Sequence, residues 1–188
     1  MCSLTGQIPD IFKYNNEEYD IVGIDGPDLF DPNSEGFQPQ MTSTACWRGF
    51  HLKFRADNEG LYLDEMSIKQ EEAVEFKGRN PIQGERRFTH KYADMNYKLP
   101  FTGRLLIAKG FIQSMYVHMG FQRPIAYRKV IELVIKEGDM LEVIDHSKHY
   151  RELRKKNPDK DGYPKTSSDE DIKDFVEKSF SRRYEIDK

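Results

Sequence analysis

The chain has 188 residues, a formal net charge of −3, 37% hydrophobic residues and 32% charged residues. This length fits one domain, and the low hydrophobic fraction indicates a strongly hydrated protein. The negative charge excludes a global positive field, so binding to nucleic acid would need a local basic patch. No segment reaches the ~18 consecutive apolar residues of a membrane helix, and Cys2 and Cys46 form no disulfide framework. We therefore expect a cytoplasmic protein with reduced thiols.

Short apolar runs occur in pairs along the chain, and a polar turn, usually with a glycine, separates the members of each pair. Four β-hairpins are therefore predicted. Their turns are expected at residues 15–16, 57–60, 109–110 and 137–138. We predict a mainly β fold, with α+β as the alternative, in which antiparallel hairpins form a sandwich or a partly open barrel. Residues 1–150 are expected to form this core within a single domain, 1–188.

The second and third hairpins begin with the same motif, an aromatic residue followed two positions later by glycine. Trp47 opens one hairpin and Phe101 opens the other. A position that accepts either ring favours packing over chemistry for Trp47.

Two long polar segments lie between the hairpins, at residues 25–43 and 70–98. Their Gly, Pro, Asn and Asp content predicts loops. Loops of this length in a compact domain are usually functional or mobile. We expect a binding surface to involve one of them.

The composition becomes strongly charged toward the C-terminus, and residues 151–166 are predicted to be a charged linker. Apolar residues then recur at helical spacing, which predicts an amphipathic helix over residues 167–183. Ser167 and Ser168, followed by Glu170 and Asp171, have the pattern of an N-terminal capping box. The pattern is the same whether this helix packs on its own sheet or on a partner, so both alternatives remain.

Residues 44–54, TACWRGFHLKF, predict a strand that holds the only tryptophan of the chain. If Phe54 pairs with Leu61, then His51 lies opposite Asp64 on the next strand. A slip in the apolar pattern at Asp64 and Glu65 also predicts a β-bulge there.

A carboxylate beside a histidine orients the imidazole and raises its basicity, so His51 and Asp64 are candidate catalytic residues. His118 is a third candidate. If the second and third hairpins pack side by side, Trp47 and Tyr116 join these residues along one groove. The alternative, a cross-strand pair with a structural role, is favoured because no nucleophile lies beside the histidine.

Two further clusters are candidate sites. Arg86 and Arg87 begin a segment that alternates basic and aromatic residues, a composition that suits stacking on single-stranded nucleic acid. Asp145, His146 and His149 offer oxygen and nitrogen donors for a metal, but a fourth ligand is absent from the pattern. A solvated loop and a charged strand end are the favoured interpretations of these two clusters.

The pairs CWRGFHLKF with GLYLDEMSI and FTGRLLIAKGFI with MYVHMGF resemble an uncharacterised group of bacterial proteins with WRGY-type and LYL-type hairpins. The resemblance spans residues 42–144. It implies a β-rich bacterial cytoplasmic domain, and it implies no activity or ligand.

The leading functional hypothesis is a non-catalytic protein that binds another protein, in the manner of an immunity, inhibitor or regulatory protein. It rests on the lack of a recognisable catalytic constellation or cofactor motif in the sequence, so no cofactor is expected. The alternatives are a hydrolase or metal-assisted enzyme with a groove around His51, Asp64 and His118, and a protein that binds single-stranded nucleic acid through residues 84–98. Nucleic acid is the less favoured partner, no membrane is expected, and the oligomeric state is left open.

Overall fold

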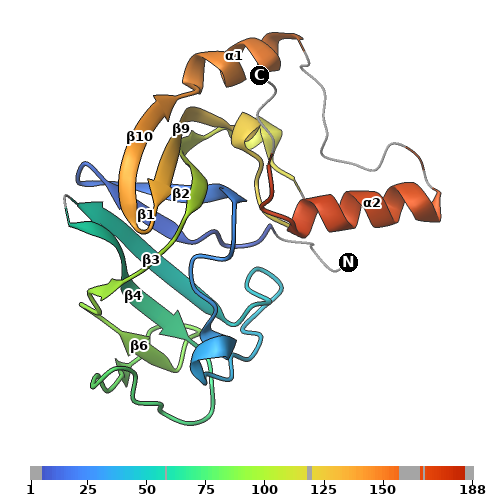
Figure 1. Ribbon diagram of the computed structural model, residues 1–188. Coiled ribbons are helices and arrows are strands. Elements are labelled where there is room, and N and C mark those ends of the chain that lie inside the picture. Colours follow the sequence, from blue (N-terminus) through green and yellow to red (C-terminus); the bar gives the residue numbers. More distant parts are fainter. Residues whose placement is uncertain (1–5, 58, 118–119, 157–165, 167, 185–188) are drawn as a thin grey trace.

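The computed structural model describes residues 6–57, 59–117, 120–156, 166 and 168–184. Ten strands form one mixed sheet in this part of the chain (Figure 1). The strands are β1 (Ile11–Tyr14), β2 (Glu17–Asp25), β3 (Phe50–Asp57), β4 (Gly60–Ile68), β5 (Ile82–Gln83), β6 (His90–Tyr92), β7 (Tyr97–Lys98), β8 (Gly103–Phe111), β9 (Tyr127–Lys136) and β10 (Asp139–Asp145). They lie in the order β10-β9-β8-β2-β1-β3-β4-β6-β5, and β7 pairs with β4. The predicted mainly β class is confirmed.

Three of the four predicted hairpins are present. Asn15 and Asn16 join β1 to β2, and Glu137 and Gly138 join β9 to β10. All four of these residues have positive φ, which is the geometry of the tight two-residue turns that match the twist of paired strands. β3 and β4 pair up to Asp57 and Gly60. These turns could be predicted because their chemistry is local.

The third predicted hairpin, around residues 109–110, is wrong. β8 continues through Lys109 and Gly110, although Gly110 has a positive φ, and its ladder with β9 extends to the pair Phe111 and Tyr127. The chain returns through two 3-10 helices, η2 (Gln113–Met115) and η3 (Pro124–Ala126). The ladder with β9 holds Lys109 and Gly110 in the strand, although the two residues have turn composition.

The sheet curls but stays open. The β9–β10 turn reaches across to the segment before β8, where the Gly138 N–H donates to the Phe101 carbonyl at 2.8 Å. Leu99 likewise donates to Leu61 of β4 at 2.9 Å. The main core fills the inside of this curl, and its members include Phe12, Ile21, Leu52, Phe54, Leu61, Leu63, Leu105 and Leu133.

A second, smaller apolar cluster forms on the other face of the sheet. It consists of Val22, Leu106, Ala108, Ala126, Tyr127, Val130 and Tyr150. Tyr150 belongs to α1 (Ser147–Lys156), so this helix covers the cluster. The predicted linker is therefore wrong for residues 151–156, which complete α1. Tyr150 and Leu153, three residues apart, give this charged segment an apolar side that can pack.

The predicted C-terminal helix is present as α2 (Asp169–Phe180). Ser168 is its N-cap and accepts a hydrogen bond from the Asp171 N–H, as the capping pattern predicts. In Figure 1 this helix points away from the sheet and meets it only at its C-terminal end. Within the described residues, no helix is both long and apolar enough to cross a membrane.

Candidate functional site

The predicted pairing of His51 with Asp64 is wrong. In the β3–β4 ladder, His51 lies opposite Ser67, and Asp64 accepts a hydrogen bond from Arg55 at 3.2 Å. The register differs because β3 extends to Asp57, so Phe54 pairs with Leu63. The predicted bulge is confirmed, since the ladder skips Asp64 between its neighbours on β4.

Two other carboxylates lie near His51. Burial lowers the pKa of His51, although the charge of Asp10 acts to raise it. Burial raises the pKa of Asp20, against a hydrogen bond from the Tyr127 hydroxyl at 2.8 Å and the charge of His51. In both groups burial favours the uncharged form.

Asp10 is the centre of a buried ion cluster. Its side chain is almost fully enclosed and accepts four hydrogen bonds: two from Arg48 at 2.8 and 3.0 Å, one from Arg182 at 2.7 Å and one from the Leu52 N–H at 3.0 Å. Burial acts to raise the pKa of Asp10, but the two guanidinium groups outweigh it and keep the pKa well below its ordinary value. We call Asp10, Arg48 and Arg182 the Asp10 clamp. Because every acceptor site of Asp10 is occupied, the carboxylate has a structural role.

Glu132 on β9 is the centre of a second buried cluster. It accepts hydrogen bonds from the Tyr184 hydroxyl at 3.0 Å and bonds the His146 ring at 3.0 Å. Arg104 lies 3.5 Å from the same carboxylate. Glu132 is 2% exposed, so these polar partners are what makes its burial tolerable.

Both buried carboxylates hold the end of the chain. We call residues 179–184 the C-terminal strap. Arg182 binds Asp10, Tyr184 binds Glu132, and the Arg182 carbonyl accepts from the Ile24 N–H of β2 at 2.7 Å. Ser179 accepts from the Phe121 N–H at 2.7 Å. The strap therefore packs on the sheet of its own chain. The last turn of α2 is held in the same way.

Trp47 lies beside the strap and outside the sheet. It belongs to a turn before β3, is 46% exposed, and stacks on Phe180 with ring centroids 4.8 Å apart. Phe101 is instead buried in the main core. The predicted equivalence of these two rings is wrong, since one packs inside the curl and the other on the surface.

The stack continues along α2. Ile172, Val176 and Phe180 follow each other at four-residue spacing, so they form one row that ends at Trp47. Ile172 is 42% exposed, and neither Ile172 nor Val176 belongs to either apolar cluster. We call Trp47, Ile172, Val176 and Phe180 the α2 ledge.

Two of the three predicted metal ligands, Asp145 and His146, form hydrogen bonds to other protein groups. His146 bonds Glu132, and Asp145 accepts from the Ser147 N–H at the start of α1 at 2.8 Å. The rings of His146 and His149 are 6.4 Å apart. Among the described residues, no group of three His, Cys, Asp or Glu side chains could hold a metal ion.

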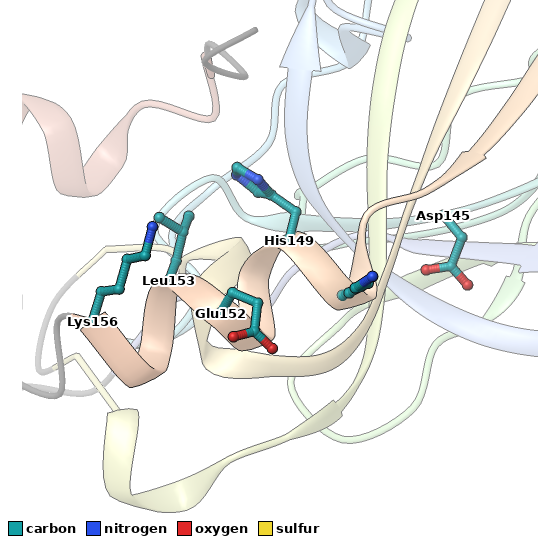
Figure 2. A pocket seen from close by; sticks show the side chains of 6 residues that line it. Asp145, His149, Glu152, Leu153 and Lys156 are labelled. Carbon is teal, nitrogen blue, oxygen red and sulfur yellow. The ribbon is translucent and has the colours of Figure 1, made fainter.

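A hollow of about 460 Å³ runs along α1. Figure 2 shows its lining, to which Asp145, His149, Glu152, Leu153 and Lys156 contribute. Asp145 extends from the end of β10 and the other side chains from α1, and they point in different directions instead of converging on one point. The hollow therefore offers mixed charges and no organised ligand set.

The segment predicted to stack nucleic-acid bases packs its rings inward. Tyr92 belongs to the main core, and Tyr97 packs against that core. Arg87 donates to the Ser43 hydroxyl at 2.7 Å, and Arg86 is exposed. Tyr92 and Tyr97 are thus taken up by the core and do not offer a free face for stacking, whereas Phe88 is half-buried.

Tyr116 and His118 complete the set of predicted groove residues. The Tyr116 hydroxyl accepts a hydrogen bond from the Gly6 N–H. His118 lies outside the described residues.

Sequence reasoning missed Asp10 and Glu132. The only signal for Glu132 is a single charge within the apolar run VIELVI of β9. A lone acid in a buried strand predicts a polar partner, although it does not say which one.

No protein-family model matches this chain. No curated protein and no solved structure matches it either. The resemblance to bacterial proteins with WRGY-type hairpins stays a prediction.

Proposed function

We propose that the protein is a non-catalytic binding protein and that it engages another protein through the α2 ledge. The observation that carries this proposal is the row of apolar side chains on a helix that stands off the sheet (Figure 1). Exposed apolar rows next to a large aromatic ring are typical of protein interfaces, where Trp often contributes most of the binding energy.

Charges beside the ledge indicate the kind of partner. The first turn of α2 carries Asp169, Glu170 and Asp171. A partner that buries Ile172 and Val176 would therefore present an apolar groove edged by lysine or arginine, because such a rim complements the acidic turn. An immunity, inhibitor or regulatory protein would use a surface of this kind.

The neighbourhood of His51 gives weaker support to an enzyme. Burial lowers the pKa of His51 and raises that of Asp20, and perturbed pKa values of this kind are common at sites of proton transfer, so an enzyme is the second candidate. However, Asp10 is saturated with donors, and the Cys46 thiol is buried and donates to the Phe50 carbonyl. Asp10 and Cys46 therefore have structural contacts that account for their burial near His51 without a catalytic role.

The proposal is tested by capture from cells that express the protein naturally. A photoreactive residue at position 172 is expected to cross-link to one partner at a reproducible ratio. The same residue at Leu141, an apolar position on β10 that is 64% exposed against 42% for Ile172, is the matched control. Ile172→Glu should abolish capture of that partner, and Leu141→Glu should leave it unchanged.

Two results would overturn the proposal. One is a partner that both glutamate variants retain, since the ledge would then be irrelevant. The other is the absence of any cross-link specific to position 172 when the protein is expressed at its natural level and remains folded by circular dichroism.

A further inference from the structure

The outer face of α1 carries a concentration of positive charge. Its ten residues, SKHYRELRKK, include five lysines and arginines and one acid, in a chain whose net charge is −3. Lys148, Arg151 and Lys155 follow each other at three- and four-residue spacing, so they form a row on one side of the helix. Lys156 ends the helix next to this row.

The neighbouring strand adds to this charge. Arg154 fixes α1 in place by donating to the carbonyls of Ile125 and Tyr127 at 2.8 and 2.7 Å. Arg128 of β9 follows Tyr127 directly, and both Arg128 and Arg151 repel the charge of Arg154. The guanidinium groups of α1 and β9 thus belong to one cationic surface.

This surface is poorly neutralised. Glu152, the only acid of α1, lies 3.1 Å from Lys155 and 3.7 Å from Arg151. Among the ion pairs between described residues, none includes Arg128 or Lys148. We call Lys148, Arg151, Lys155, Lys156 and Arg128 the α1 cationic face.

We propose that the α1 cationic face binds the phosphate backbone of nucleic acid without reading the bases. A row of cations one helical turn apart suits a polymer with regularly repeating negative charges. This surface differs from residues 84–98, and it is independent of the α2 ledge.

The apolar side chains of α1 argue against other polyanionic partners. Tyr150 is part of the second apolar cluster, and Leu153 packs against that cluster. A helix that lies on a membrane needs a free apolar face to insert, and α1 has used its own internally. A protein interface usually needs an apolar or aromatic anchor at its centre, which the cationic row does not contain.

The test is fluorescence anisotropy with labelled mixed-sequence DNA, as a duplex and as a single strand of about 20 nucleotides, over a range of salt concentrations. The full chain is expected to bind at low salt, and log Kd should rise linearly with log salt concentration. Arg128→Glu/Arg151→Glu should weaken binding about tenfold or more at about 50 mM salt and flatten the slope by about one unit for each cation that contacts a phosphate.

Lys13→Glu/Lys98→Glu is the matched control, because it makes the same change in net charge at exposed lysines of β1 and β7. Wild-type affinity is expected for this variant. The proposal is overturned if the full chain does not bind either DNA at about 20 mM salt, or if both double variants weaken binding equally. Binding to vesicles of anionic lipid, with none to DNA, would also overturn it and assign the face to a membrane surface.

Discussion

The two helices are attached to the same sheet in opposite ways. α1 lies along the sheet with Tyr150 and Leu153 on the second apolar cluster, and its charged side chains other than Arg154 and Glu152 are exposed. α2 is attached by its last turn and by the C-terminal strap, and part of its apolar row stays exposed. A helix attached by its side has only its charges left for a partner, whereas a helix attached by its end keeps its apolar side.

The attachments also differ in energetic character. Apolar burial stabilises α1 roughly in proportion to the area removed from water. The strap depends on buried charges, whose attraction is largely offset by the cost of removing them from water. Such contacts contribute less net stability, but losing one partner is costly because the other charge is left buried. The Asp10 clamp therefore specifies where α2 is held more than it adds to stability.

The largest expected effect comes from removing the charge of the clamp. Asp10→Asn leaves Arg48 and Arg182 facing a neutral amide, which should lower the free energy of unfolding by about 3 to 5 kcal/mol. Urea denaturation measures this loss. Trp47 is the only tryptophan and stacks on Phe180, so its emission should also shift to longer wavelength as the strap loosens.

Asp139→Asn is the control for this prediction, since Asp139 is exposed on β10. It should leave both stability and tryptophan emission unchanged. If Asp10→Asn costs less than about 1 kcal/mol, the value typical of an exposed ion pair, the clamp does not hold the strap.

The next effect comes from the apolar attachment of α1. Tyr150→Ala should cost about 2 to 3 kcal/mol, somewhat less than a fully enclosed aromatic side chain, because Tyr150 is 9% exposed. In the folded variant the emission of Trp47 should not change, since α1 is not part of the Trp47–Phe180 stack. Tyr150→Phe, which keeps the ring, should lose far less stability. A shift of Trp47 emission in folded Tyr150→Ala would show that the two attachments are coupled.

Local turn chemistry made much of the fold predictable from the sequence. Asn15, Asn16 and Gly138 are residue types that favour the positive φ found at their positions, so their hairpins could be predicted, whereas Glu137 adopts positive φ without such a preference. Lys109 and Gly110 have similar composition but lie within a strand, because pairing with the distant β9 decides their conformation. Tertiary pairing of this kind leaves no local pattern.

The candidate site was less predictable for the same reason. Asp10 receives its donors from Arg48, 38 residues away, and from Arg182, 172 residues away. The bulge at Asp64 could be predicted because it interrupts an alternation of apolar residues. The neighbours of His51 could not, since a register difference of a few residues replaces every cross-strand partner.

The smallest expected effect is a pH dependence of the free energy of unfolding. It should act through His51 on the Asp10 clamp, which holds α2, and not on α1. Burial lowers the pKa of His51, and the ring lies close enough to Asp10 for the two charges to interact. Because the folded pKa lies below the ordinary value of about 6.5, the unfolded chain binds a proton more readily than the folded chain. The free energy of unfolding is then unaffected by this group above the ordinary pKa, and it falls as the pH drops from there toward the folded pKa.

His51→Gln removes the titrating ring and retains a polar side chain, so it should flatten this part of the pH dependence. The measurement is urea denaturation at several pH values between 7 and the acidic range in which the carboxylates begin to titrate. Lys13→Gln removes one positive charge at an exposed site on β1 and should keep the wild-type slope. If His51→Gln keeps the wild-type slope of the free energy of unfolding against pH, protonation of the histidine does not affect the clamp. If the slope disappears and Trp47 emission becomes independent of pH over the same interval, acidification acts on the end-attached helix through His51.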